Sequence, residues 1–269
     1  MARIPPAAAR HPVRSLALGY LLAFAVPWTV WGTLIAEQRG LLGWHVPQAM
    51  AFWIGLPLAC IVGALAGGGK AGLTDLLGRV LAWRVGWRWF GIAALLAAGI
   101  PAVVALGARA AAIPAPADVL PLGQVPLSLL VEILLFWLTE EAMWRGFALP
   151  RIQLWLAPGP ASLVVGVLWA LWHLPLFAIV GSFQAGLPLA GFFVLTVATA
   201  VVLGWLYERT GGSVPVCAVY HGIVDITFAS TGVLTAAPAT FWTVVALQVA
   251  VAGLLWWRVA SRSAVATVG

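Results

Sequence analysis

The feature that most constrains this chain is a series of long, unbroken apolar runs. Each run is about 20 residues long, the length that an α-helix needs to cross ~30 Å of hydrocarbon. Strands of a transmembrane barrel would instead give alternating segments of ~10 residues. The sequence therefore predicts an all-α, polytopic membrane protein of about eight transmembrane helices. The expected spans are residues 16–36, 48–67, 89–111, 125–149, 161–180, 188–207, 214–232 and 239–260.

The composition agrees with lipid as the main solvent of the folded chain. Hydrophobic residues make up 63% of the sequence and charged residues only 8%, whereas soluble domains carry about 25% charged residues. The net charge of +6 comes from basic residues in short loops, so we expect a lipid bilayer as partner and no nucleic acid. Cys60 and Cys217 lie inside apolar runs and are interpreted as small buried hydrophobic residues. No oligomeric state is specified.

Residues 1–269 are interpreted as a single membrane domain with three distinguishable parts. Residues 1–15 form an Ala- and Pro-rich arm that we expect to be loose. Residues 68–88 mix basic residues with Trp, which favours a short helix lying in the membrane interface. Residues 125–232 form the core. The first apolar run exceeds the 7–15 residues of a signal peptide, so we expect it to be retained as a helix.

The basic residues predict the orientation. With a cytoplasmic N-terminus and eight spans, 12 of the 14 Lys and Arg residues fall on the cytoplasmic side, and only Arg39 and Arg109 fall outside. The positive-inside rule therefore predicts that both termini are cytoplasmic. Residue usage rich in Ala, Gly, Arg and Trp suggests a GC-rich bacterial genome, so we expect a bacterial plasma membrane.

Several ionisable residues lie within the expected spans, where a charge costs ~2.5–3.5 kcal/mol even on the mildest scale. Such residues usually face a cavity or a partner and indicate function. At 1.5 Å per residue, four of them lie roughly 10–18 Å from the cytoplasmic ends of their helices. These four are Glu140, His173, His221 and Asp225. We expect them to share one polar cavity, open to the cytoplasm. The ionisable residues are Glu132, Glu140, Glu141, His173, His221 and Asp225.

Spacing within the helices adds detail. Glu141 and Arg145 are four residues apart and can pair. Glu140 points about 100° away around the helix, so that pair does not readily reach it. A carboxylate left alone in an apolar site is suited to act as a general base. His221 and Asp225 also share a helical face, with the same spacing.

Three motifs follow in order: Glu140-Glu141-x-x-x-Arg145, Trp169-x-x-x-His173 and His221-x-x-x-Asp225. This arrangement resembles the CPBP family of intramembrane proteases, also called the Abi or CAAX-protease family. Its pattern is E-E-x-x-x-R, F-x-x-x-H and H-x-x-x-N/D on successive core helices. The WRVGWRW stretch before the third span is also similar. The resemblance covers residues 130–230 by motif and the whole chain by span number.

The resemblance implies an endopeptidase that cuts a membrane-associated protein or peptide near the cytoplasmic face. In that case Glu140 activates water, His173 positions the water and shuttles its proton, and His221 and Asp225 stabilise the oxyanion. Glu141 and Arg145 support the site as an ion pair.

The chain departs from the family pattern at two positions. Trp169 replaces Phe but is still aromatic. Asp225 stands where the prenyl-protein endopeptidase branch has an amide. A carboxylate donates a hydrogen bond only when it is protonated. Asp225 thus has three possible roles: to orient His221, to act as a protonated donor, or to bind a metal.

Metal and other functions are the alternatives. No cofactor is favoured, but Glu140, His173 and His221 are acceptable zinc ligands, and three ligands plus water is a catalytic zinc arrangement. Buried acidic and His residues also build proton relays, so a proton-coupled transporter or channel is a second hypothesis. A non-catalytic immunity or scaffold protein that kept the site is a third. Transporters often show two matching halves, whereas all core motifs here lie in the C-terminal half.

Overall fold

The computed structural model describes the backbone of residues 4–265 and side chains as far as residue 256. This part of the chain consists of helices joined by short loops and contains no strand. The long helices are α1 (Pro12–Gln38), α2 (Leu56–Val80), α3 (Trp87–Ala110), α4 (Val125–Leu138), α6 (Pro158–Trp172), α7 (Leu189–Arg209), α8 (Val214–Thr231) and α9 (Pro238–Val265), with the short α5 (Leu149–Ile152). Short 3-10 or π-helical turns are η1 (Pro6–Ala9), η2 (Ala51–Gly55), η3 (Leu122–Gln124), η4 (Ala142–Ala148), η5 (Leu174–Ala178) and η6 (Gln184–Gly186).

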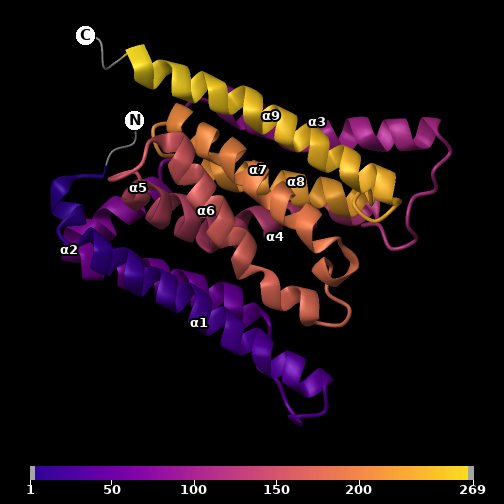
Figure 1. Cartoon of the computed structure of the whole chain (residues 1–269), viewed down its shortest axis with the longest axis horizontal. Coiled ribbons are helices and arrows are strands. Elements are labelled where there is room, and N and C mark those ends of the chain that lie inside the picture. Colours follow the sequence, from indigo (N-terminus) through magenta and orange to yellow (C-terminus); the bar gives the residue numbers. More distant parts are fainter. Residues whose placement is uncertain (1–3, 266–269) are drawn as a thin grey trace.

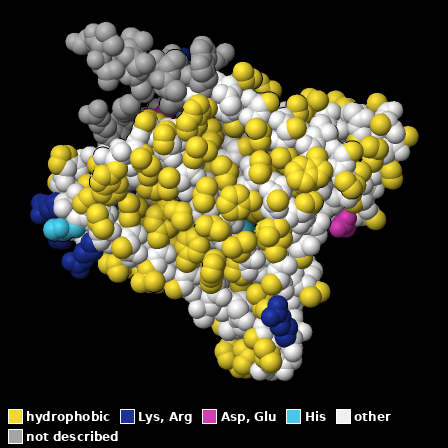
Figure 2. Space-filling model, viewed as in Figure 1, with side chains coloured by type: hydrophobic (Ala, Val, Ile, Leu, Met, Phe, Trp, Pro, Cys, Tyr) yellow, Lys and Arg dark blue, Asp and Glu magenta, His cyan; other side chains and the backbone are white. Residues whose placement is uncertain are grey.

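The prediction of eight membrane spans is confirmed. Among the described residues, eight helical segments are long and apolar enough to cross a bilayer. The fourth joins η3, α4, η4 and α5 into one continuous segment, Leu122–Ile152. The fifth joins α6 and η5, Pro158–Ala178. Large apolar side chains are exposed along these segments, and Figure 2 shows them spread over the flank of the bundle, as lipid contact requires.

The helices lie roughly along one common direction, with α1 and α2 paired on one side and α3 and α9 on the other (Figure 1). Helix α8 packs against both α3 and α4, and α7 packs against α6 and α9. The first described residues and the C-terminal part of α9 lie at the same end of the bundle (Figure 1), which we call the terminal end. The loops 81–86, 153–157 and 210–213 also lie there.

The opposite end of the bundle, which we call the distal end, carries the loops 39–50, 111–121, 179–188 and 232–237. Three hydrogen bonds join segments at these two ends. At the terminal end, Ser213 Oγ donates to the Ala82 carbonyl (2.6 Å). At the distal end, Gln38 Nε2 donates to the Val180 carbonyl (3.1 Å), and the Leu120 N–H donates to the Ala229 carbonyl (2.8 Å).

The predicted interfacial segment begins at a break in α2. Gly69 has φ 56° and ψ −138° inside this helix, a conformation that suits glycine. Residues 70–80 continue as a second, shorter helical stretch. Arg79 in this stretch is 8% exposed and donates to Asp75 and to the Tyr207 hydroxyl. Arg79 is thus tied to α7, whereas we had expected the basic groups of this segment to face headgroups.

The described part of the N-terminal arm is packed rather than loose. Ala8 in η1 is 1% exposed, and the His11 N–H donates to the Gly67 carbonyl (2.9 Å). The arm lies on α2 because Gly67 and Gly68 leave room for its backbone: a Cβ on Gly68 would lie 2.6 Å from the Ala8 carbonyl. Residues 1–3 lie outside the described residues.

Candidate active site

The paired glutamates lie where the fourth membrane segment departs from regular α-helix. Thr139 ends α4 with φ −118° and ψ −86°, and its hydroxyl donates to the Leu135 carbonyl (2.6 Å). The π-helical turn η4 follows directly after Glu140 and Glu141. Such turns are frequent at functional sites because they rotate the side chains that precede and follow them. Here the irregularity directs two adjacent carboxylates toward different partners.

Glu140 is held by two tryptophans. Its Oε2 accepts a hydrogen bond from Trp169 Nε1 (2.5 Å) on α6 and a longer one from Trp144 Nε1 (3.3 Å) on η4. Only 2% of its surface is exposed. Oε1 makes no hydrogen bond to any described residue, so one oxygen is fixed while the other remains available. This is the arrangement that a general base needs, because its geometry is set before the substrate arrives.

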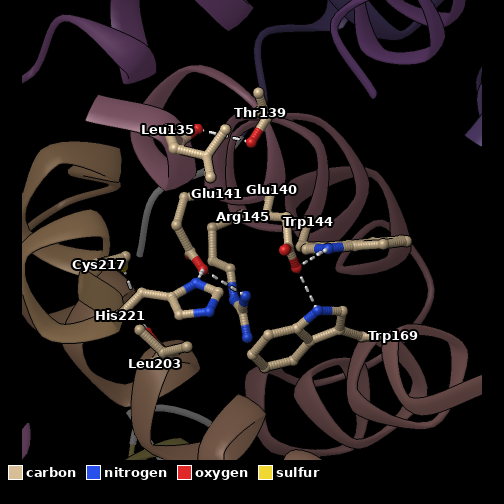
Figure 3. A network of polar contacts seen from close by, with 10 residues as sticks. All are labelled: Leu135, Thr139, Glu140, Glu141, Trp144, Arg145, Trp169, Leu203, Cys217 and His221. Carbon is tan, nitrogen blue, oxygen red and sulfur yellow. Dashed lines mark hydrogen bonds and ion pairs between the residues drawn. The ribbon is translucent and has the colours of Figure 1, made fainter. Parts of the chain in front are cut away.

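Glu141 joins two helices. Its Oε1 accepts from Arg145 Nη1 (2.8 Å), which confirms the predicted ion pair. The same oxygen contacts His221 Nδ1 at 2.8 Å. Figure 3 shows the His221 ring and the Arg145 side chain converging on this carboxylate, with Trp169 beside them. The guanidinium of Arg145 also lies 4.5 Å from the centre of the Trp169 ring, a cation–π contact.

The two histidines each have one ring nitrogen fixed. His221 stacks on Phe136 of α4, with ring centroids 3.7 Å apart and an angle of 4°. Its Nδ1 is held by Glu141, and not by Asp225, which the sequence had offered as a possible orienting residue. His173 Nδ1 lies 2.8 Å from the Trp169 carbonyl. A carbonyl only accepts, so this nitrogen carries the proton and Nε2 keeps a lone pair.

The four candidate catalytic residues line one cavity. Its volume is about 750 Å³, and Glu140, His173, His221 and Asp225 are all among its lining residues. Glu132, one turn of helix above Phe136, lines it too. Among the described residues that line the cavity, four are acidic and none is Lys or Arg.

The cavity opens at the distal end of the bundle. Loop residues at its rim are Asp118, Gln124, Gln184 and Thr235, all in connections at that end. The first described residues and the C-terminal part of α9 lie at the other end (Figure 1). The cavity mouth and the first described residues thus lie toward opposite ends of the bundle.

The described side chains at this site are not grouped as a metal-binding cluster. Within the described part of the chain, no three His, Cys, Asp or Glu side chains lie together in a way that could hold a metal ion. Nδ1 of each histidine and Oε2 of Glu140 are engaged by protein groups, whereas no described residue bonds to Nε2 of either histidine or to Oε1 of Glu140.

Two residues that contact the site had not been singled out from the sequence. Trp144 supplies the second donor to Glu140, and Phe136 supplies the stacking surface for His221. Trp144 is four residues after Glu140, a spacing that could have indicated contact. Phe136 carries no comparable signal, because its contact depends on how α4 packs against α8.

Comparison with known proteins identifies the same segment. Residues 122–227 match the family model described as type II CAAX prenyl endopeptidase, Rce1-like. A protein of Methanococcus maripaludis named CAAX prenyl protease 2 is 27% identical over 96 residues, which cover 32% of this chain and 34% of that relative. The match therefore spans about a third of the relative's length. All three motifs lie within the matched segment, so these findings support the resemblance of this part of the chain to the CPBP, or CAAX-protease, family.

Proposed function

We propose that this protein is an intramembrane endopeptidase that hydrolyses a peptide bond of a membrane-associated protein or peptide. The observation that carries the proposal is the shared cavity, in which Glu140 presents one unengaged carboxylate oxygen beside His173 and His221. The family match supports the same reaction class. The protein lies in a lipid bilayer. We expect this bilayer to be a bacterial plasma membrane, with both termini in the cytoplasm.

In the proposed mechanism Glu140 acts as general base. Its unengaged oxygen takes a proton from a water molecule as the water oxygen bonds to the carbonyl carbon of the substrate. His173 Nε2 accepts a hydrogen bond from this water, then takes over from Glu140 the proton that the water has lost and passes it to the departing amine. The C–N bond breaks as the amine receives this proton, leaving a carboxyl and an amine product.

The developing oxyanion is assigned to the opposite wall of the cavity. Nε2 of His221 would donate to it in the imidazolium form, with the charge balanced by Glu141 at Nδ1. Asp225 would donate only while protonated, because an ionised carboxylate has no donor. Glu141 and Arg145 act through His221 and Trp169 and are positioning residues.

The cavity favours hydrolysis over transport. A transporter or channel needs a route that reaches both faces of the membrane. The lining residues come from the distal loops and from helix positions between these loops and the middle of the bundle, and the deepest, such as Glu140 and His221, lie just past the midpoints of their segments. A non-catalytic membrane partner would keep this architecture without turnover, so activity has to be measured.

The test uses the purified protein in detergent with a mixed library of membrane-associated peptides. The wild type is expected to cleave members of the library, and Glu140→Gln is expected to cleave none, because glutamine keeps the shape and removes the base. Parallel reactions with a strong chelator test the metal-free mechanism, which predicts that the cleavage rate stays unchanged. A wild type that cleaves nothing would remove the proposal and favour a non-catalytic role.

A further inference from the structure

We infer that the substrate of this protein enters its cavity from the non-cytoplasmic side of the membrane, opposite to the chain termini. The inference rests on the proposed function in one respect, because it assumes that the protein has a substrate. Its geometric part, the direction in which the cavity faces, is independent of any activity.

The first step is the position of the mouth. Asp118 and Gln124 lie before α4, Gln184 lies between α6 and α7, and Thr235 lies between α8 and α9. These connections are all at the distal end. A peptide that reaches Glu140 through this mouth passes Glu132 and Asp225 on the way.

The second step is the closure of the other end beneath Glu140. Phe147 of η4 is fully buried and wedged between α1 and α2. A Cβ on Gly19 or on Gly63 would lie 2.4 Å from its ring, so the three segments are in closest contact there. Arg151 covers the other side of this ring, with its guanidinium 4.2 Å from the ring centre. This packing fills the space between α1, α2 and the fourth segment on the terminal side of Glu140.

The third step is the distribution of charge between the two ends. At the distal end the described basic residues are Arg39 and Arg109 alone, and the others lie at the terminal end or just inside it. Figure 2 shows Lys and Arg side chains gathered at the left, where the described chain begins, and a single basic group at the lower right. Because short loops rich in Lys and Arg stay in the cytoplasm, the terminal end is cytoplasmic and the mouth faces the other side.

This direction limits the substrate class. The scissile bond has to lie in an extracytoplasmic segment close to the membrane surface, such as the outer flank of a membrane span or a peptide already exported. A lipidated tail on the cytoplasmic side cannot reach the mouth. The acidic lining of Asp118, Glu132 and Asp225, without a basic residue, further favours segments that carry Lys or Arg over acidic segments.

Cysteine labelling in intact cells tests the direction without any need for activity. Thr235→Cys places a thiol at the mouth, and Leu154→Cys places one in an exposed loop at the terminal end. Both native cysteines are buried, so the wild type serves as the unlabelled blank. A membrane-impermeant maleimide is expected to label Thr235→Cys in intact cells and Leu154→Cys only after permeabilisation. The reverse pattern, or equal labelling of both in intact cells, overturns the inference.

A second measurement concerns entry of the substrate. Once a cleaved library peptide is known, a bulky maleimide attached at Thr235→Cys is expected to abolish its cleavage, while the same adduct at Leu154→Cys leaves the rate unchanged. Full activity of the Thr235→Cys adduct would refute entry through this mouth. If neither protein cleaves before labelling, the proposed function fails, while the labelling pattern in cells still decides the direction of the cavity.

Discussion

Replacing Trp169 by phenylalanine keeps an aromatic ring at the centre of the site but removes the indole N–H that donates to Glu140. This hydrogen bond is short, with 2.5 Å between Nε1 and Oε2, and both residues are buried. A hydrogen bond to a charged group contributes about 1.5–3 kcal/mol. If the bond holds the carboxylate in position for proton transfer, its loss lowers kcat by about 10- to 100-fold, since each ~1.4 kcal/mol is a factor of ten. KM should change little, because the indole fixes the base rather than the substrate.

The matched control is Trp144→Phe, which removes the longer donor to the same oxygen (3.3 Å). We expect a smaller loss, below about tenfold, because a bond of this length is weaker. The assay is steady-state cleavage of one library peptide, with thermal unfolding in detergent to show that both variants fold. A folded Trp169→Phe protein with wild-type kcat would refute the view that Trp169 positions Glu140. The family carries Phe at this position, so the test also asks whether this chain depends on its own tryptophan.

Three further changes probe the remaining parts of the site. Glu141→Gln removes the carboxylate that balances Arg145 and holds His221, and should lower the free energy of unfolding by about 3–5 kcal/mol. The measurement is the midpoint of thermal unfolding, which should fall. An unchanged midpoint would contradict a structural role of Glu141. Asp225→Asn supplies an amide donor and should retain or raise kcat, whereas Asp225→Ala should lower it about tenfold or more; equal rates for both would exclude an oxyanion role. Gly222→Ala puts a Cβ 2.7 Å from Ile133, so it should push α4 from α8 and cost about 1–3 kcal/mol, whereas Gly78→Ala, with open space around it, should not.

The sequence was sufficient for the membrane architecture because each span depends only on its own length and apolarity. It also predicted the pair between Glu141 and Arg145, since both lie on one helix and their spacing determines whether they can meet. The grouping of Glu140, His173, His221 and Asp225 around one cavity followed from comparing depths along separate helices. That comparison needed only the rise per residue.

Contacts between helices could not be predicted in this way. The bond from Trp169 to Glu140 and the contact of His221 with Glu141 depend on the rotation of α6 and α8 relative to the fourth segment. That rotation depends on close packing, such as that of Ile133 on Gly222. The end of the bundle at which the cavity opens could not be predicted for a related reason. Depth from the cytoplasmic end can be counted, but which end of the bundle is filled by side chains such as Phe147 depends on three-dimensional packing.

The central claim is that the Glu140 carboxylate activates water for peptide hydrolysis. The most direct test compares kcat/KM of Glu140→Gln with that of Glu208→Gln, which makes the same chemical change at the terminal end, where Glu208 accepts a hydrogen bond from Gln153. Loss of a general base is expected to lower kcat/KM by about 10²–10⁴-fold in Glu140→Gln, while Glu208→Gln stays near the wild-type value. Equal and substantial activity of the two folded variants would contradict the claim.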